Sequence, residues 1–180
     1  RFPVKQDIMK VSVSPKGDVG AFSLSLGKRR VTLLQERMRH MTILVIDGQG
    51  GKLGRSLVEN IKKSFPHVEV MAVGTNSAAS DAMRRAGADR VATGENPVIV
   101  ACRSAQIIAG PIGIAIADAL MGEISPAMAS AVASSCAYRV LIPMNLCSTY
   151  VAGVSGKSAT LMDDALRRIG ELLNETEKSQ

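Results

Sequence analysis

The 180-residue sequence has few aromatic side chains, which make up 3% of its residues, and it contains no Trp. Proteins that bind single-stranded nucleic acid by stacking its bases rely on aromatic side chains, so nucleic acid is not an expected partner of the body of this protein. The core must instead be built from Val, Ile, Leu, Ala and nine Met. Small aliphatic side chains suit closely packed layers of helices and strands.

Cysteine and histidine are scarce as well. The three cysteines contain no CxxC pair, which argues against a disulfide framework and a cysteine zinc site. With only two His in the chain, Ser–His–Asp catalysis, Cys–His catalysis and His-based metal sites are not expected, because each needs a histidine beside its partners. We therefore expect no metal site.

Long hydrophobic runs are also missing. The longest apolar stretch, Ile107 to Met121, is too short to cross a bilayer and is interrupted by Asp118 and by Gly and Pro residues. No leader-like hydrophobic segment is present near the first residue. We expect a cytoplasmic protein that has no membrane partner.

Positive charge is confined to one end of the chain. Residues 1–40 hold nine Lys or Arg against three Asp or Glu, which accounts for the whole net charge of +6 and leaves residues 41–180 neutral. We expect residues 1–40 to be a basic N-terminal extension, either hairpin-like or disordered, followed by a single domain over residues 41–180. Because Met41 directly precedes the first predicted strand, an alternative is that the native protein starts there and that the extension is not part of it.

From Met41 onward, short β-branched runs alternate with helical patterns, which is typical of a parallel sheet with crossover helices. The alternation predicts an α/β, Rossmann-like, doubly wound fold with a mainly parallel sheet of five or six strands. Expected strands are 43–46, 68–73, 90–92, 107–109 and 138–142, with 150–154 as a sixth, and expected helices are 53–65, 77–85, 97–103, 126–134 and 158–173. Asn76 and Ser125 are expected N-caps, and Asn96 with Pro97 is expected to begin the short helix that runs through residue 103.

The loop after the first strand is the clearest ligand signal. Three glycines, Gly48, Gly51 and Gly54, are spaced GxxGxxG between a strand and a helix. Backbone N–H groups at such a turn point toward an anion, so the pattern predicts a phosphate-binding loop formed by Asp47, Gly48, Gln49, Gly50, Gly51 and Gly54. The alternative is that the glycines only allow a tight turn and close helix packing.

The identity of the ligand stays open at this point. NAD-binding folds place Asp or Glu at the end of the second strand for the ribose hydroxyls, whereas this chain has Gly74, Thr75 and Asn76 there. NAD(P) is thus one option among nucleotides and small phosphorylated ligands. The loop does not fit the Walker A pattern.

Other candidates follow the remaining strands, because the carboxyl ends of parallel strands share one edge of the sheet. Thr75, Asn76, Gly110 and Gly113 are expected to contact the ligand. Asp47 and Glu95 are weak candidates for a proton-handling or metal-holding group. The alternatives are that Asp47 only caps nearby N–H groups and that Glu95 is a solvated surface acid.

Several motifs together resemble a known family: the run from Met41 to Gly51 and the segments Ala72–Ser77, Gly87–Asp89, Ala92–Asn96, Gly110–Gly113 and Gly122–Met128. They are similar to a bacterial family of small proteins filed as a domain of unknown function, over about residues 41–155. The resemblance implies a Rossmann-like domain and supplies no reaction. It also implies a start near Met41. Members of the family often have a further glycine at the position that Lys52 occupies here.

Two functional hypotheses follow from the sequence. The first is a small Rossmann-like protein that binds a nucleotide, dinucleotide or other phosphorylated ligand at the glycine loop. The second is a non-enzymatic ligand sensor or homo-oligomeric assembly protein, favoured by the lack of His and of a separate substrate domain. A homodimer through the Ala-, Met- and Ser-rich segment 126–134 is expected in that case.

Overall fold

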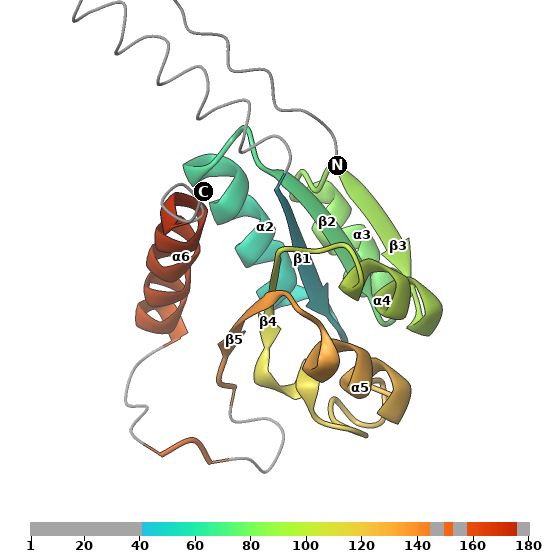
Figure 1. Ribbon diagram of the computed structural model, residues 1–180. Coiled ribbons are helices and arrows are strands. Elements are labelled where there is room, and N and C mark those ends of the chain that lie inside the picture. Colours follow the sequence, from blue (N-terminus) through green and yellow to red (C-terminus); the bar gives the residue numbers. More distant parts are fainter. Residues whose placement is uncertain (1–40, 145–149, 153–157, 176–180) are drawn as a thin grey trace, which may run out of the picture. The chain divides into compact units, whose positions relative to one another are not determined.

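The computed structural model describes residues 41–144, 150–152 and 158–175, so the expected N-terminal extension lies outside the described residues. Strands and helices alternate along the described chain (Figure 1). The strands are β1 (Thr42–Asp47), β2 (Glu69–Gly74), β3 (Arg90–Thr93), β4 (Ile107–Pro111) and β5 (Tyr138–Ile142). The helices are α2 (Lys52–Ser64), α3 (Ser77–Arg85), α4 (Glu95–Cys102), α5 (Pro126–Ser134) and α6 (Ser158–Glu175), with the short 3-10 helix η1 (Ile112–Ala115) after β4.

The five strands form one parallel sheet in the order β3-β2-β1-β4-β5. β1 lies at its centre and pairs with β2 through Ile43↔Val70 and with β4 through Ile43↔Ile107. The chain winds outward from β1 to β3 and then returns to the other side of β1, where β4 and β5 continue the sheet. The fold is therefore Rossmann-like and doubly wound, as the sequence predicts, and its winding reverses between β1 and β4.

Helices cover both faces of the sheet, which explains why the central strands β1 and β4 are buried along their whole length. Ile43 and Val45 of β1 belong to the core beneath α2 and α6, whereas Leu44 and Ile46 belong to the core beneath α4 and α5. All four side chains are completely buried. Successive residues of a strand point to opposite faces, so each face of β1 contributes to a separate core.

Two local expectations from the sequence are wrong. Residues 150–152 do not form a strand, and the remainder of the expected sixth strand lies outside the described residues. Helix α4 begins at Glu95 with Gly94 as its N-cap, not at Pro97 with Asn96 as the cap. Gly94 has a φ of 102°, which a glycine tolerates far better than other residues, and this lets the helix start earlier. Within the described residues, no helix is long and apolar enough to span a membrane.

Candidate functional site

The glycine loop joins β1 to α2 at the carboxyl edge of the sheet. Gly51 has a φ of 65° and forms the N-cap of α2. A Cβ at Gly51 would lie 2.7 Å from Cα of Ala79, and one at Gly54 would lie 2.6 Å from Sδ of Met83. These two glycines therefore allow α3 to pack closely against the start of α2. Gly50 differs, because a Cβ there would meet nothing within 4 Å.

Asp47 ends β1 and turns its carboxylate toward the start of α2. Its Oδ1 accepts a hydrogen bond of 2.8 Å from the N–H of Gly48, and its Oδ2 accepts one of 2.7 Å from the N–H of Gly54. The side chain is buried at 5% exposure. Asp47 thus supplies a negative charge to the N-terminus of α2, where an anion is stabilised by free N–H groups and by the helix dipole. This geometry matches the capping alternative for Asp47.

Glu123, from the loop between η1 and α5, reaches the same place from the other half of the chain. Its Oε2 accepts hydrogen bonds from the N–H of Gln49 at 2.8 Å, from Nδ2 of Asn76 at 2.9 Å and from the hydroxyl of Thr75. Among the described residues, Oε1 of Glu123 has no hydrogen-bond partner, and it is not a fully buried atom. One carboxylate oxygen is therefore fixed by three donors, while the other has no partner in the part of the chain that the structure describes.

The two carboxylates have pKa values shifted in opposite directions. Burial raises the pKa of Asp47 above its ordinary value, although the hydrogen bonds from Gly54 and Gly48 lower it and the nearby charge of Glu123 raises it further. Burial also acts to raise the pKa of Glu123, but the hydrogen bonds from Thr75, Gln49 and Asn76 outweigh it, so the pKa is lowered. Glu123 is accordingly a stable anion at neutral pH.

Thr75 and Asn76 follow β2 and connect it to the glycine loop. The N–H of Thr75 donates to the carbonyl of Asp47 at 3.0 Å, and Nδ2 of Asn76 donates to the carbonyl of Gln49 at 3.0 Å. Oδ1 of Asn76 accepts from the N–H of Ala79 at 3.0 Å, which confirms Asn76 as the N-cap of α3. The structure thus brings Gln49, Thr75 and Asn76 together around Glu123.

Glu95 lies at the start of α4 and contacts α5. The hydroxyl of Ser125 donates to Oε2 of Glu95 and accepts from the N–H of Met128 at 3.2 Å, so Ser125 is the N-cap of α5 as the sequence predicts. The Glu95 side chain therefore joins the first turns of α4 and α5. The hydrogen bond between Ser125 and Glu95 thus has a structural role in this helix pair.

Gly110 allows close packing of two strands, whereas Gly113 lies in the following 3-10 helix. Gly110 lies within β4, and a Cβ there would lie 2.3 Å from the carbonyl oxygen of Ile46. Its missing side chain lets β4 approach β1 at the point where the winding reverses. Gly113 is buried in η1, where its carbonyl accepts from the N–H of Ile116 at 3.0 Å.

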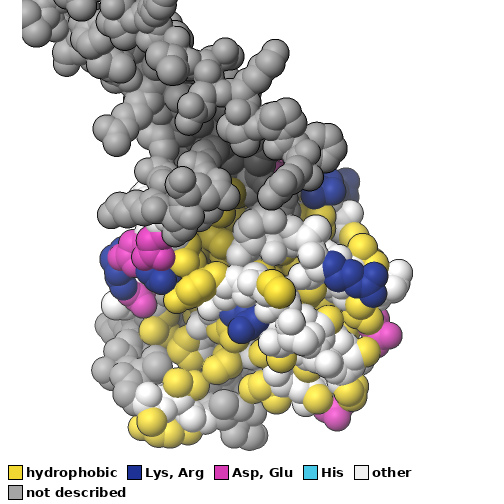
Figure 2. Space-filling model, in the orientation of Figure 1, with side chains coloured by type: hydrophobic (Ala, Val, Ile, Leu, Met, Phe, Trp, Pro, Cys, Tyr) yellow, Lys and Arg dark blue, Asp and Glu magenta, His cyan; other side chains and the backbone are white. Residues whose placement is uncertain are grey.

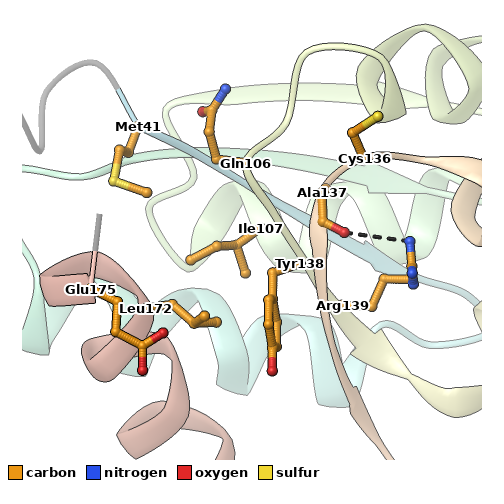
Figure 3. A pocket seen from close by; sticks show the side chains of 9 residues that line it. All are labelled: Met41, Gln106, Ile107, Cys136, Ala137, Tyr138, Arg139, Leu172 and Glu175. Atoms are coloured by element: carbon orange, nitrogen blue, oxygen red, sulfur yellow. Dashed lines mark hydrogen bonds between the residues drawn. The ribbon is translucent and has the colours of Figure 1, made fainter. Parts of the chain in front are cut away.

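A cavity of about 710 Å³ lies at the opposite, amino edge of the sheet. Its lining comes from the starts of β4 and β5, the residue before β1 and the C-terminal end of α6 (Figure 3). Ligands of doubly wound folds bind at the carboxyl edge, at the reversal of the winding. This cavity therefore lies away from the candidate site.

The site offers hydrogen-bond acceptors, and Lys52 is exposed at the start of the adjoining helix α2. Among the described residues, no group of three or more His, Cys, Asp or Glu side chains is placed to hold a metal ion. The arrangement is suited to binding a ligand that donates hydrogen bonds to Glu123.

Glu123 is the residue that the sequence interpretation missed. It lies in the segment Gly122–Met128, which carries part of the family resemblance, yet nothing in its immediate sequence marks it as a partner of Thr75. The available signal is its position after β4, because loops after the strands on both sides of the reversal meet at one edge of the sheet.

The fold and the site define a small Rossmann-like α/β protein with an anchored carboxylate at the carboxyl edge of its sheet. Residues 42–174 match the family described as Domain of unknown function (DUF3842), and the chain belongs to this family. No curated protein matches the sequence.

Proposed function

We propose that this protein binds a nucleotide at the carboxyl edge of its sheet, with the sugar hydroxyls donating hydrogen bonds to Glu123. The observation that carries the proposal is the state of the Glu123 carboxylate, whose Oε2 is held by Gln49, Thr75 and Asn76 while Oε1 has no partner among the described residues. Oε1 belongs to an ionised carboxylate that is held in place through Oε2, and such an oxygen is a strong acceptor for a hydroxyl group.

The position of Glu123 supports a ribose as the group that it binds. In doubly wound folds that bind dinucleotides, an acid at the end of the second strand accepts from the ribose hydroxyls. Here the end of β2 has no acid, but Glu123 from the other half of the chain lies against Thr75 and Asn76. The acceptor that the sequence lacks at this strand is thus supplied by a residue much later in the chain.

The phosphate groups would occupy the outer side of the glycine loop. On the inner side of this turn, the N–H of Gly54 already donates to the carboxylate of Asp47. A second anion is therefore not favoured there. Gln49 and Gly50 are exposed, Gly50 has open space around it, and Lys52 adds a positive charge. Backbone N–H groups and a lysine at an exposed loop tip are suitable partners for phosphate.

Ligand titration of the full chain tests this proposal. We expect at least one of NAD(H), NADP(H), ATP, GTP, FAD and coenzyme A to raise the melting temperature. A 2′-deoxy form of the active ligand should bind about 10- to 100-fold more weakly, since a hydrogen bond to a charged group contributes about 1.5–3 kcal/mol. If no ligand raises the melting temperature at concentrations far above any plausible Kd, the proposal is wrong.

One variant and a matched control test whether Glu123 makes the contact to the sugar. Glu123→Gln should remove most of the difference between the ribose and deoxyribose forms, because the neutral amide is a weaker acceptor. Glu59→Gln is the matched control, since Glu59 is exposed on α2 and pairs with Arg55. The control variant should keep the full difference.

Self-association through α4 and α5 is a second candidate function. No charged side chain lies between Asn96 and Cys102 or between Pro126 and Ser134, and the surface over α5 is mostly hydrophobic or uncharged (Figure 2). Ala127→Glu should lower the mass measured by light scattering if a dimer forms there. Ala78→Glu is the matched control, because Ala78 is exposed at the equivalent second position of α3.

A further inference from the structure

Residues 116–124, which we call the cap loop, connect η1 to α5 through an unusual backbone. Asp118, Leu120 and Met121 have φ angles of 60°, 54° and 61°, and Gly122 has a φ of 88°. Left-handed backbone is uncommon outside glycine, and for side chains such as Leu and Met it is strained. Three such residues within four positions make this loop conformation less stable than an ordinary turn.

Beyond Ile116, whose N–H donates to Gly113 of η1, the cap loop makes its backbone hydrogen bonds with itself. The N–H of Asp118 donates to Ile124 at 2.8 Å, that of Ile124 donates to Ala119 at 3.2 Å, and that of Gly122 donates to Asp118 at 3.1 Å. Among the described residues, no recorded backbone hydrogen bond joins residues 117–123 to an element outside the cap loop. The loop can therefore move as one body without breaking a backbone hydrogen bond to the sheet.

Leu120 and Glu123 are two of the side chains that hold the cap loop in place. Leu120 is 7% exposed, and its Cδ1 would lie 3.0 Å from a Cβ at Gly48. Oε2 of Glu123 would lie 2.7 Å from the same Cβ position and accepts the N–H of Gln49. Both side chains thus cover the start of the glycine loop, where a ligand has to approach.

We infer that the cap loop is a lid that opens as a unit, with Ile116 and Ile124 at its hinges, and that its left-handed residues keep this opening easy. Opening moves Leu120 and Glu123 away from Gly48 and frees the N–H of Gln49. The fixed end after the loop supports this motion, because Ser125 caps α5. Compact loops with close ends and their own internal bonding are often such moving parts.

The inference rests on the proposed function only for the identity of the ligand, a nucleotide, that enters when the lid opens. Its test uses no nucleotide, so either conclusion can fail while the other stands. The readout is hydrogen exchange of the Gln49 N–H, measured residue by residue by NMR on the full chain. This N–H is held by Glu123 and should exchange whenever the lid opens.

A pair of substitutions at Met121 changes the strain alone. Met121 is 95% exposed, so Met121→Ala and Met121→Gly both remove a side chain that packs against nothing. Only glycine relieves the left-handed strain, although its greater freedom in the open loop offsets part of the gain. We expect the Gln49 N–H to exchange roughly threefold more slowly in M121G than in M121A.

The N–H of Gly54 serves as the internal control, because it donates to Asp47, which lies outside the cap loop. Its exchange rate should be the same in both variants. Equal rates for Gln49 in M121G and M121A would overturn the inference. Equal slowing of Gln49 and Gly54 would overturn it as well, since it would mean that Gln49 exchanges through a larger unfolding event.

Discussion

The N–H of Gly54 donates a 2.7 Å hydrogen bond to Oδ2 of Asp47, which joins the first turn of α2 to the end of β1. The bond also places a buried carboxylate where doubly wound proteins commonly bind a phosphate. An acid of the chain itself therefore occupies the inner side of this turn. A ligand is left with the outer side of the loop and with Glu123.

The free energy of unfolding should depend on pH through Asp47, in the direction expected for a buried carboxyl group. The raised pKa of Asp47 means that the folded state holds the proton more tightly than the unfolded state. Its contribution to stability is thus complete below the ordinary carboxyl pKa and falls as pH rises through the raised value. Urea unfolding of the wild type and of Asp47→Asn should give a difference in unfolding free energy that shrinks as pH rises, and a constant difference would contradict this.

Glu123 should show the opposite dependence on pH. Its pKa is lowered by the three hydrogen bonds that outweigh burial, so its contribution is present above the ordinary glutamate pKa and is lost as pH falls through the lowered value. The difference in unfolding free energy between the wild type and Glu123→Gln should therefore be largest near neutral pH. A difference that grows on acidification would show that Glu123 is not held as an anion.

The glycines of the site should differ sharply in their tolerance of a side chain. Gly110→Ala places a Cβ 2.3 Å from the Ile46 carbonyl oxygen, and we expect a loss of about 1–3 kcal/mol in the free energy of unfolding from overpacking. Gly50→Ala, which has open space, should change it by no more than about 0.5 kcal/mol. Denaturant unfolding measures both, and equal losses would contradict the assigned packing.

The cysteines should differ in reactivity. Burial raises the pKa of Cys102 to about 11, whereas Cys136 is exposed. Because the thiolate is the reactive form, iodoacetamide at pH 8 should modify Cys136 well before Cys102, as followed by mass spectrometry of the separate peptides. Unfolding in urea should abolish the difference, and rapid modification of Cys102 in the folded protein would contradict its burial.

Much of the fold could be predicted because the local signals agree with the tertiary structure. The bounds Ser77–Arg85 and Pro126–Ser134 match those predicted, since Asn76 and Ser125 mark these helix starts through their capping hydrogen bonds. The bounds of β5 match as well. The start of α4 differs from the predicted one because Gly94, with a φ of 102°, forms the N-cap in place of Asn96.

The candidate site could be predicted only in part. The sequence places Gln49, Thr75 and Asn76 at one edge of the sheet, because each follows a parallel strand. It cannot place Glu123, since a contact across 48 positions depends on the path of the cap loop. That path in turn requires left-handed backbone at Leu120 and Met121, which no residue preference indicates.

The strand order also has a consequence for folding. β1 meets β2 through Ile43 and Val70, but it meets β4 through Ile43 and Ile107, which are much farther apart in the chain. Contacts between distant segments form late because a longer loop must close first. We expect the β1–β2–β3 half to fold before β4 docks, so Glu123 joins Thr75 only after that half has formed, and the proposed nucleotide site stays incomplete until synthesis has passed Glu123.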